Sequence, residues 1–182
     1  MKILVSVFNN LYTDQRVEKF CKTLHENAYQ IEVIGNNWGG TPEMKRPYPF
    51  SRISLQSKKL RFAYLEFQWK LFLVLLKKAD RNTILHANDL DALLPNYLVS
   101  KIKGIPLVWD SHEIFTEMPT VTNRWVQHVW RLLENALIRK IKYFITANDS
   151  YANWFETNYK IKRPIVIRNF PQKSESPKSF VE

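Results

Sequence analysis

Glycine is scarce in this sequence of 182 residues, which has only four glycines, at positions 35, 39, 40 and 104. They form neither a G-x-G-x-x-G turn nor a G-x-x-x-x-G-K-[ST] phosphate loop. Such loops hold nucleotides because their backbone amides closely approach the phosphates. We therefore do not expect this chain to hold a dinucleotide or ATP in a glycine-rich turn, and we predict no cofactor.

Cysteine is nearly absent, and long apolar runs are missing. Cys21 is the only cysteine, which excludes an internal disulfide and favours a reduced, cytoplasmic compartment. The apolar segment 3–8 is short, and no small-residue cleavage site follows it, so it predicts a first strand rather than a signal peptide. No uncharged run reaches 18 residues, so we predict no membrane span.

Acidic residues are outnumbered, with 17 Asp and Glu against 27 Lys and Arg, which gives a formal net charge of +10. A basic protein is attracted to phosphates, whether these belong to nucleic acid, lipid or nucleotide. The sequence has no zinc-finger spacing, no RNA-binding motif and no recognisable helix-turn-helix. The positive charge is therefore the only feature that points to nucleic acid, and we do not predict nucleic acid as a partner.

Short apolar segments alternate with segments of helical spacing along the chain. Strands are predicted at 2–8, 30–34, 52–55, 83–87, 106–109, 143–147 and 164–167, and helices at 14–27, 61–79, 90–103, 124–142 and 150–159. Asp14 or Thr13, and Asn123, are suited to cap two of these helices. The strands are unbroken apolar runs, which is typical of parallel sheets covered on both faces. The pattern predicts an α/β fold, a doubly wound Rossmann-like parallel sheet with helices on both faces.

Polar residues follow most of these strands. The strand ends read Asn9-Asn10, Gly35-Asn36-Asn37, His86-Ala87-Asn88-Asp89, Asp110-Ser111-His112-Glu113 and Asn148-Asp149. Ligands of such sheets bind at the carboxyl ends of the strands, so these groups are expected to form one site.

The histidine in the segment "VWDSHEIF" has two interpretations. The imidazole of His112, flanked by Asp110 and Glu113, is suited to hydrogen-bond a hydroxyl substrate near neutral pH. On the bare sequence, a histidine that caps a backbone carbonyl in the turn after a strand is the simpler interpretation. A metal site built from His86, Asp89, Asp110, His112 and Glu113 is conceivable, but no spacing among them is diagnostic, and we predict none.

The helical segment 62–76 is apolar nearly all round and is flanked by Lys and Arg. It is either a buried helix that covers the sheet, or an interfacial element that touches anionic lipid. In the second case Trp69 and Tyr64 are the expected amphipathic anchors.

Four segments together resemble the N-terminal domain of glycosyltransferase family 4 enzymes, over about residues 1–171. They are "FNNLYTDQRVEKFCKTL", "ILHANDLDALLPNYLVSKIKGIPLVWDSHEIF", "RWVQHVWRLLENALIRKIKYFITANDSYANWF" and "PIVIRNFP". The resemblance implies one half of a GT-B architecture, in which two Rossmann-like domains face a cleft. It also implies hexosyl transfer from a nucleotide-sugar to a hydroxyl acceptor, with retention and without a metal.

The resemblance also assigns roles to residues. It places the family's cleft histidine, close to the hydroxyls of the transferred sugar, at His112, our predicted catalytic residue. The predicted acceptor- or sugar-binding residues are Asn9, Asn10, Asp14, Arg16, Asn88, Asp89, Asp110 and Glu113. Three positions depart from the family pattern. Asn10-Leu11-Tyr12-Thr13 stands where many members have Gly-Gly, Asn148 stands where Ser is common, and Asn169-Phe170-Pro171 replaces the usual Asn-Gly.

Residues 1–171 are thus expected to be the acceptor-side domain, and 172–182 a polar linker or tail toward a donor-binding domain. No second Rossmann unit with the family's paired glutamates follows, so we expect this chain alone to be inactive, as a piece of a longer enzyme or one half of a split enzyme. The expected partners are a saccharide or lipid-linked acceptor, a nucleotide-sugar held by the other domain, and peripherally the anionic inner face of a membrane. The alternatives are half of a GT-B-like sugar-nucleotide epimerase, or a non-catalytic basic Rossmann-like binding module.

Overall fold

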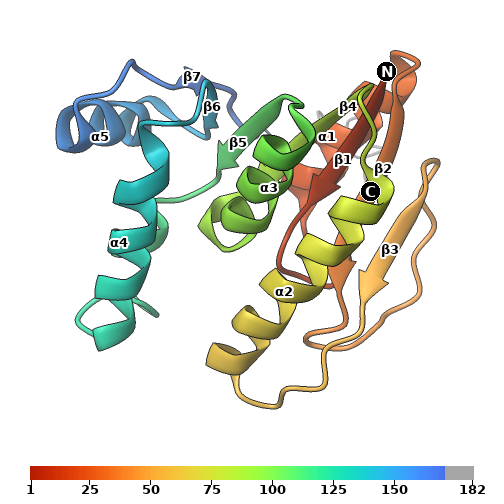
Figure 1. Cartoon of the computed structure of the whole chain (residues 1–182), viewed down its shortest axis with the longest axis horizontal. Coiled ribbons are helices and arrows are strands. Elements are labelled where there is room, and N and C mark those ends of the chain that lie inside the picture. The colour runs from red at the N-terminus through yellow and green to blue at the C-terminus, as the bar shows by residue number, and fades with distance from the viewer. Residues whose placement is uncertain (171–182) are drawn as a thin grey trace, which may run out of the picture.

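The computed structural model describes residues 1–170, which form one sheet of seven parallel strands with five α-helices (Figure 1). The strands are β1 (Lys2–Ser6), β2 (Gln30–Asn36), β3 (Phe50–Ile53), β4 (Thr83–Asn88), β5 (Leu107–Ser111), β6 (Tyr143–Thr146) and β7 (Ile165–Val166). The helices are α1 (Gln15–Glu26), α2 (Leu60–Lys78), α3 (Asp89–Lys103), α4 (Trp125–Ile138) and α5 (Asp149–Tyr159), with a 3₁₀ turn η1 (Phe115–Glu117). The predicted tail, 172–182, lies outside the described residues.

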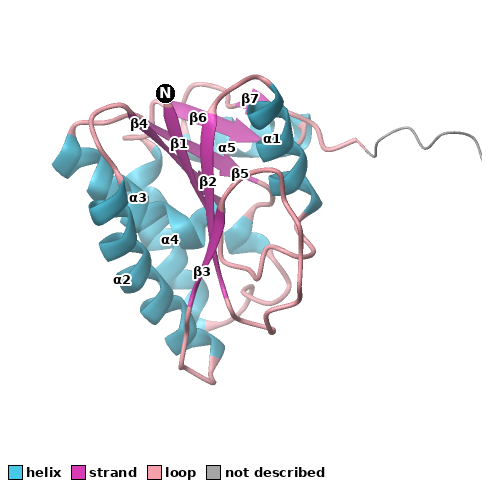
Figure 2. Cartoon of the chain, turned by 90° about the vertical axis from the view of Figure 1, so that its right-hand side faces the viewer, coloured by secondary structure: helices cyan, strands magenta, loops and turns pink. Residues whose placement is uncertain are grey.

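The sheet is covered on both faces, which explains its unbroken apolar strands (Figure 2). In β1, Leu4 packs with α2, α3, α4 and α5 in one core, while Ile3 and Val5 pack with α1 and the loop 37–49 in the other. Since successive side chains of a strand point to opposite faces, both sets must be apolar. The predicted doubly wound α/β fold is therefore confirmed.

The strand order is β3-β2-β1-β4-β5-β6-β7. From β1 the chain proceeds outward to β2 and β3, then returns through α2 and places β4 on the other side of β1. The order of the strands therefore reverses between β1 and β4, which creates the crevice where sheets of this kind bind ligands.

Local signals set several helix ends as predicted. The Asp14 side chain accepts a hydrogen bond from the Val17 amide at 2.9 Å and so caps α1. Gly104 ends α3 in the left-handed conformation, with φ of 65°, which only glycine adopts without strain.

The predicted cap at Asn123 is wrong. Asn123 itself has φ of 62°, and its amide donates to the side chain of Gln127 at 3.1 Å. Arg124 occupies the cap position of α4 without a side-chain cap bond. The helix also ends at Ile138 rather than at 142, because the chain tightens into a turn there and enters β6 at Tyr143.

Helix α2 covers the sheet, as one of the two interpretations expected, and buries Ala63 and Phe67 among others. Tyr64, expected as an exposed anchor, instead packs against Phe8 and Trp130, with ring centroids 4.3 and 5.5 Å away. That part of the prediction is wrong, because the side chains of Phe8 and of Trp130 from α4 pack on the ring. Trp69 does lie at the surface. No helix within residues 1–170 is long and apolar enough to cross a membrane.

Candidate functional site

The carboxyl ends of β1, β4 and β5 lie next to one another, because these three strands are neighbours in the sheet. Ser6 of β1 pairs with Ala87 of β4, and Asn88 of β4 pairs with Asp110 of β5. The predicted site residues that follow these strands are thereby gathered at the point where the strand order reverses. The geometric part of the sequence prediction is correct for Asn88, Asp89, Asp110 and His112.

His112 is the centre of this cluster and bridges the ends of β4 and β5. Its Nε2 lies 3.1 Å from Asn88 Oδ1 and 3.7 Å from Asp110 Oδ2, and its Nδ1 lies 3.4 Å from Asp89 Oδ2. Its backbone amide donates to Asp89 Oδ1 at 2.8 Å. The imidazole is therefore held on two sides and keeps 15% of its side chain exposed, at the edge of the sheet.

The partners of His112 are themselves fixed in place. Asn88 donates its Nδ2 to the backbone carbonyl of Ser6 at 3.1 Å, so its Oδ1 is the atom left to accept from His112. Asp89 has φ of 59°, a left-handed conformation that is unusual for a residue other than glycine. Such strain persists only where the surroundings enforce it, and it concentrates at functional sites.

Electrostatics make His112 a cation. Burial alone would lower the pKa of His112, but the carboxylates of Asp89 and Asp110 outweigh burial and raise it to about 9. At neutral pH both ring nitrogens therefore carry protons; Nε2 donates to Asn88 Oδ1, and Nδ1 faces Asp89 as an ion pair. A ring in this state serves as a positively charged donor and not as a base.

Asp110 lies beneath the histidine, with 2% of its side chain exposed. Arg16 of α1 donates to Asp110 Oδ1 at 2.6 Å and, through its other terminal nitrogen, to the carbonyl of Ile167 at 2.6 Å. Burial would raise the pKa of Asp110, but hydrogen bonds from His112 and Arg16 outweigh it and lower the pKa to about 2. Arg16 thus reaches the cluster as a partner of Asp110, with little of its side chain open to a ligand.

The predicted residues after β1 build the loop that precedes α1. Asn9 donates to Asp14 at 2.7 Å and accepts from the Leu11 amide at 2.8 Å, and Asn10 accepts from the Tyr12 amide at 3.0 Å. The loop rests on Gly35 of β2, where an added Cβ would lie 2.6 Å from the Asn9 carbonyl oxygen. The side chains of Asn9, Asn10 and Asp14 therefore shape the rim of the site through bonds to their own loop.

Glu113 is exposed beside the cluster, and its backbone carbonyl accepts from the Ser111 hydroxyl at 2.6 Å. Within the described chain, no hydrogen bond or ion pair joins its carboxylate to His112. A cavity of about 320 Å³ borders the cluster on the α1 side, lined by Arg16, Asp110 and the segment 167–170. His112 does not line it and opens instead to the edge of the sheet.

Asp91 was not predicted, although it lies beside the cluster in the first turn of α3. It is buried, and its Oδ1 has no hydrogen-bond partner among residues 1–170. Burial and then the neighbouring Asp89 raise the pKa of Asp91 well above its ordinary value. Tyr64 of α2 lies near both carboxylates. The Asp-Leu-Asp sequence after β4 was the available signal, since it places two carboxylates in one helical turn.

Within residues 1–170, no three or more His, Cys, Asp or Glu side chains are grouped so that they could hold a metal ion. The candidate metal site that included His86 and His112 is not assembled, because the ring of His86 packs toward α1. Its ring stacks on Phe20 of α1 with centroids 4.4 Å apart. Burial lowers the pKa of His86 to about 4, so this ring is neutral.

Comparison with protein families gives a match over most of the chain. The model described as Glycosyltransferase Family 4 matches residues 14–170 of this chain. Those residues include α1, the strand ends around His112 and the segment 167–170. Comparison with curated protein sequences gives no match.

Solved structures share the fold. Sucrose-phosphate synthase from Thermosynechococcus elongatus is similar with a TM-score of 0.62 at 10% identity, over 92% of this chain and 87% of that one. MurG from Acinetobacter baumannii has a TM-score of 0.58 at 12% identity, over 97% of this chain and 50% of that one. UDP-GlcNAc 2-epimerase from Methanocaldococcus jannaschii has a TM-score of 0.53 at 13% identity, over 92% and 45%. The chain spans about half the length of the last two proteins, and at these identities the likeness concerns the fold alone.

Proposed function

The chain belongs to glycosyltransferase family 4, and from that premise we propose that it is the acceptor-binding domain of a retaining glycosyltransferase. The proposed reaction moves a sugar from a nucleotide-sugar to a hydroxyl of a glycan or of a lipid-linked acceptor. The bond between the anomeric carbon and the donor phosphate breaks, a bond to the acceptor oxygen forms, and the acceptor hydroxyl loses its proton. The proposal includes no metal and no other cofactor.

One observation carries the proposal: the imidazole of His112 is fixed at the reversal point of the sheet between Asn88, Asp89 and Asp110. The two carboxylates raise its pKa and so favour its protonated form. A cation at this place attracts the electron-rich hydroxyls of the transferred sugar and favours the negative charge that develops as the phosphate leaves. The pKa of about 9 keeps His112 charged throughout the neutral range, so its part is to donate and to orient. Because His112 already carries both protons, the acceptor proton is proposed to pass to the departing phosphate oxygen of the donor.

Other predicted residues receive narrower parts in this proposal. Asp89 holds the imidazole and keeps part of its side chain exposed, so it is proposed to contact sugar hydroxyls. Asn88 is buried and bonded to Ser6 and His112, so its proposed part is to position the imidazole. Glu113 is the exposed carboxylate beside them and is proposed to contact the acceptor. The loop of Asn9 and Asn10 is proposed to limit the acceptor's approach.

The other half of the active site is proposed to lie on a further domain or a partner chain, because the chain spans about half of two of the structures that it resembles. Residues 1–182 alone are expected to bind an acceptor without turnover. Family membership favours this over an epimerase, since the epimerase likeness at 13% identity concerns the fold. We propose a cytoplasmic location, peripheral to the inner face of a membrane when the acceptor is lipid-linked.

Saturation-transfer NMR on the 182-residue chain tests the proposal, with a panel of acceptor saccharides and nucleotide-sugars. We expect a saccharide to bind without nucleotide, and His112→Ala to weaken that binding at least tenfold. His128→Ala is the matched control, because His128 is an exposed histidine of α4. Unchanged saccharide binding by His112→Ala would refute the role of His112, and efficient transfer by the chain alone would refute the requirement for a second half.

A further inference from the structure

Helix α2 is apolar on two opposite sides. One side packs into the core and consists of residues at four-residue spacing, namely Ala63, Phe67, Leu71 and Leu75. This stripe is sufficient to attach the helix to the sheet. An apolar residue elsewhere on α2 therefore needs another explanation.

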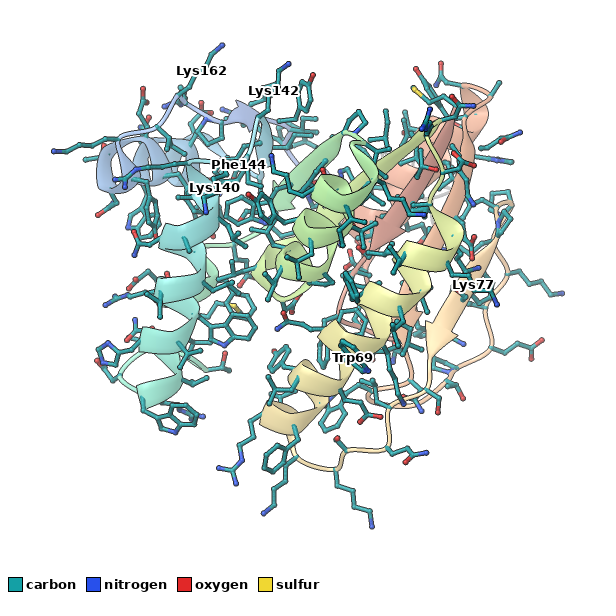
Figure 3. The ribbon with its side chains drawn as sticks, in the orientation of Figure 1. Trp69, Lys77, Lys140, Lys142, Phe144 and Lys162 are labelled. Carbon is teal, nitrogen blue, oxygen red and sulfur yellow. The ribbon has the colours of Figure 1, made fainter. Side chains whose placement is uncertain are left out.

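The opposite side carries a second line with the same spacing, two residues out of step with the first. Two residues correspond to about 200° of helix rotation, so the second line faces away from the sheet. We call it the outer stripe; it consists of Arg61, Leu65, Trp69, Leu73 and Lys77. Figure 3 labels Trp69 and Lys77 along α2, which lies in front of the sheet in that view. Leu65, Trp69 and Leu73 are 65%, 62% and 46% exposed, so three large apolar side chains in a row face outward.

Positive charge borders this apolar row at both ends. Arg61 and Lys77 end the outer stripe, and Lys58 and Lys59 precede the helix. None of these four cations forms an ion pair within the described part of the chain. Glu66, the acidic residue of α2, is occupied, since it accepts from the Ser57 hydroxyl at 2.6 Å and from Lys70 at 2.7 Å. The outer stripe therefore meets its surroundings with uncompensated positive charge.

We propose that the outer stripe docks the domain on an anionic lipid surface, with α2 lying parallel to that surface. The sixteen-residue step from Arg61 to Lys77 corresponds to ~24 Å of helix, with apolar side chains in its middle. Trp and Leu enter the boundary between headgroups and acyl chains, while Arg and Lys extend toward the phosphates. A second copy of this chain fits less well, because an isologous contact along the stripe would bring like charges together.

The biological role of this docking, though not the docking itself, rests on the proposed function. A helix that follows a parallel strand begins at the carboxyl edge of the sheet, so the Arg61 end of the outer stripe lies at the same edge as His112. Tyr64, one turn along, packs toward this edge against Phe8. A membrane at the outer stripe would bring lipid headgroups to the site, so the acceptor class is a lipid-linked hydroxyl.

Vesicle flotation of the full chain tests the docking. The probes are vesicles of phosphatidylcholine alone and of an equal mixture with phosphatidylglycerol. We expect binding to the anionic vesicles and at least a tenfold loss in the double variant Leu65→Ser with Trp69→Ser. The matched control is Trp125→Ser with Leu132→Ser on α4, whose side chains are 68% and 72% exposed. This control should bind within about twofold of the original chain.

A charge variant separates electrostatic from apolar attraction. Each cation near an anionic surface contributes about fivefold in affinity, so Arg61→Gln with Lys77→Gln should lose roughly 25-fold on the mixed vesicles. All replaced side chains are exposed, so the melting temperature should not change, which keeps folding out of the comparison.

Three results would overturn the docking: no binding of the original chain to anionic vesicles, equal losses in the stripe and control variants, or a dimer that the stripe variant abolishes while vesicles are ignored. The assay contains no sugar. Vesicle binding without saccharide binding would therefore reject the proposed function and keep the docking surface, and the converse result would do the opposite.

Discussion

Removing one carboxylate next to His112 should discharge the histidine near neutral pH. The variant Asp89→Asn suits this test because asparagine adopts the left-handed conformation of residue 89 readily and still accepts from the His112 amide. The substitution therefore removes charge and keeps the geometry.

The expected size of the effect follows from the structure. The ordinary pKa of histidine is 6.5, and that of His112 is about 9, a difference worth about 3 kcal/mol at ~1.4 kcal/mol per pKa unit. At the 3.4 Å between His112 Nδ1 and Asp89 Oδ2, two unit charges attract by about 5 kcal/mol at an effective dielectric constant of about 20. Solvent weakens this attraction, because the side chains of His112 and Asp89 are 15% and 23% exposed at the edge of the sheet. Loss of Asp89 should therefore lower the pKa of His112 by about two units.

The direct assay is an NMR pH titration of the histidine ring signals, with His112 assigned from its absence in His112→Gln. Asp149→Asn is the control, since Asp149 is an acid that pairs with Arg163 at 2.9 Å on the surface. We expect an unchanged His112 titration in that control. A His112 pKa at or below 6.5 in the original chain, or one that Asp89→Asn does not move, would refute the electrostatic reasoning.

Stability should follow the same titration. Because the folded pKa of His112 lies above the unfolded value, its stabilising contribution is complete below pH 6.5 and is lost as the pH rises through about 9. Urea unfolding should therefore show the original chain to be more stable than Asp89→Asn at about pH 6, with this advantage gone at about pH 10.

Two further predictions concern buried charge. Arg16→Gln leaves Asp110 buried with one cation fewer, so we expect a loss of about 3 kcal/mol in the free energy of unfolding by urea, and a near-unchanged value would contradict the pairing. Burial raises the pKa of Glu134 to about 7, although Tyr159 and Thr116 donate hydrogen bonds to its carboxylate. Because the folded pKa lies above the ordinary value of 4.5, Glu134 should destabilise the fold as the pH rises from 4.5 through about 7. Glu134→Gln should therefore flatten the pH dependence of the melting temperature in that range, and an equally steep dependence in the variant would reject this assignment.

The sequence was sufficient for the sheet and for the edge where His112 meets Asn88 and Asp89. Unbroken apolar strands indicate a parallel sheet that is covered on both faces, and the carboxyl ends of its strands lie at one edge. Neither inference requires knowledge of tertiary contacts. Those inferences depend on local pattern and on a general rule of topology.

What the sequence could not predict depends on which elements become neighbours. The pairing of Arg16 with Asp110 joins residues 94 positions apart, and the ring of Tyr64 is covered by Phe8 and by Trp130, which lies 66 positions later in the chain. The charge of His112 also results from two carboxylates that come from different elements, Asp89 from the start of α3 and Asp110 from β5. Residue types and their positions after the strands therefore located the site. The protonation of His112 and the exposure of Arg16 and Tyr64 depended on tertiary packing.

The guanidinium of Arg16 holds two parts of the chain at once, since one nitrogen binds Asp110 and the other binds the carbonyl of Ile167. If the segment after β7 moves away from α1, either this carbonyl loses its donor or Arg16 leaves Asp110. In the second case the carboxylate is free to turn fully toward the imidazole. Such a movement of residues 167–170 would therefore change the pKa of His112, because the carboxylate of Asp110 is one of the groups that raise it.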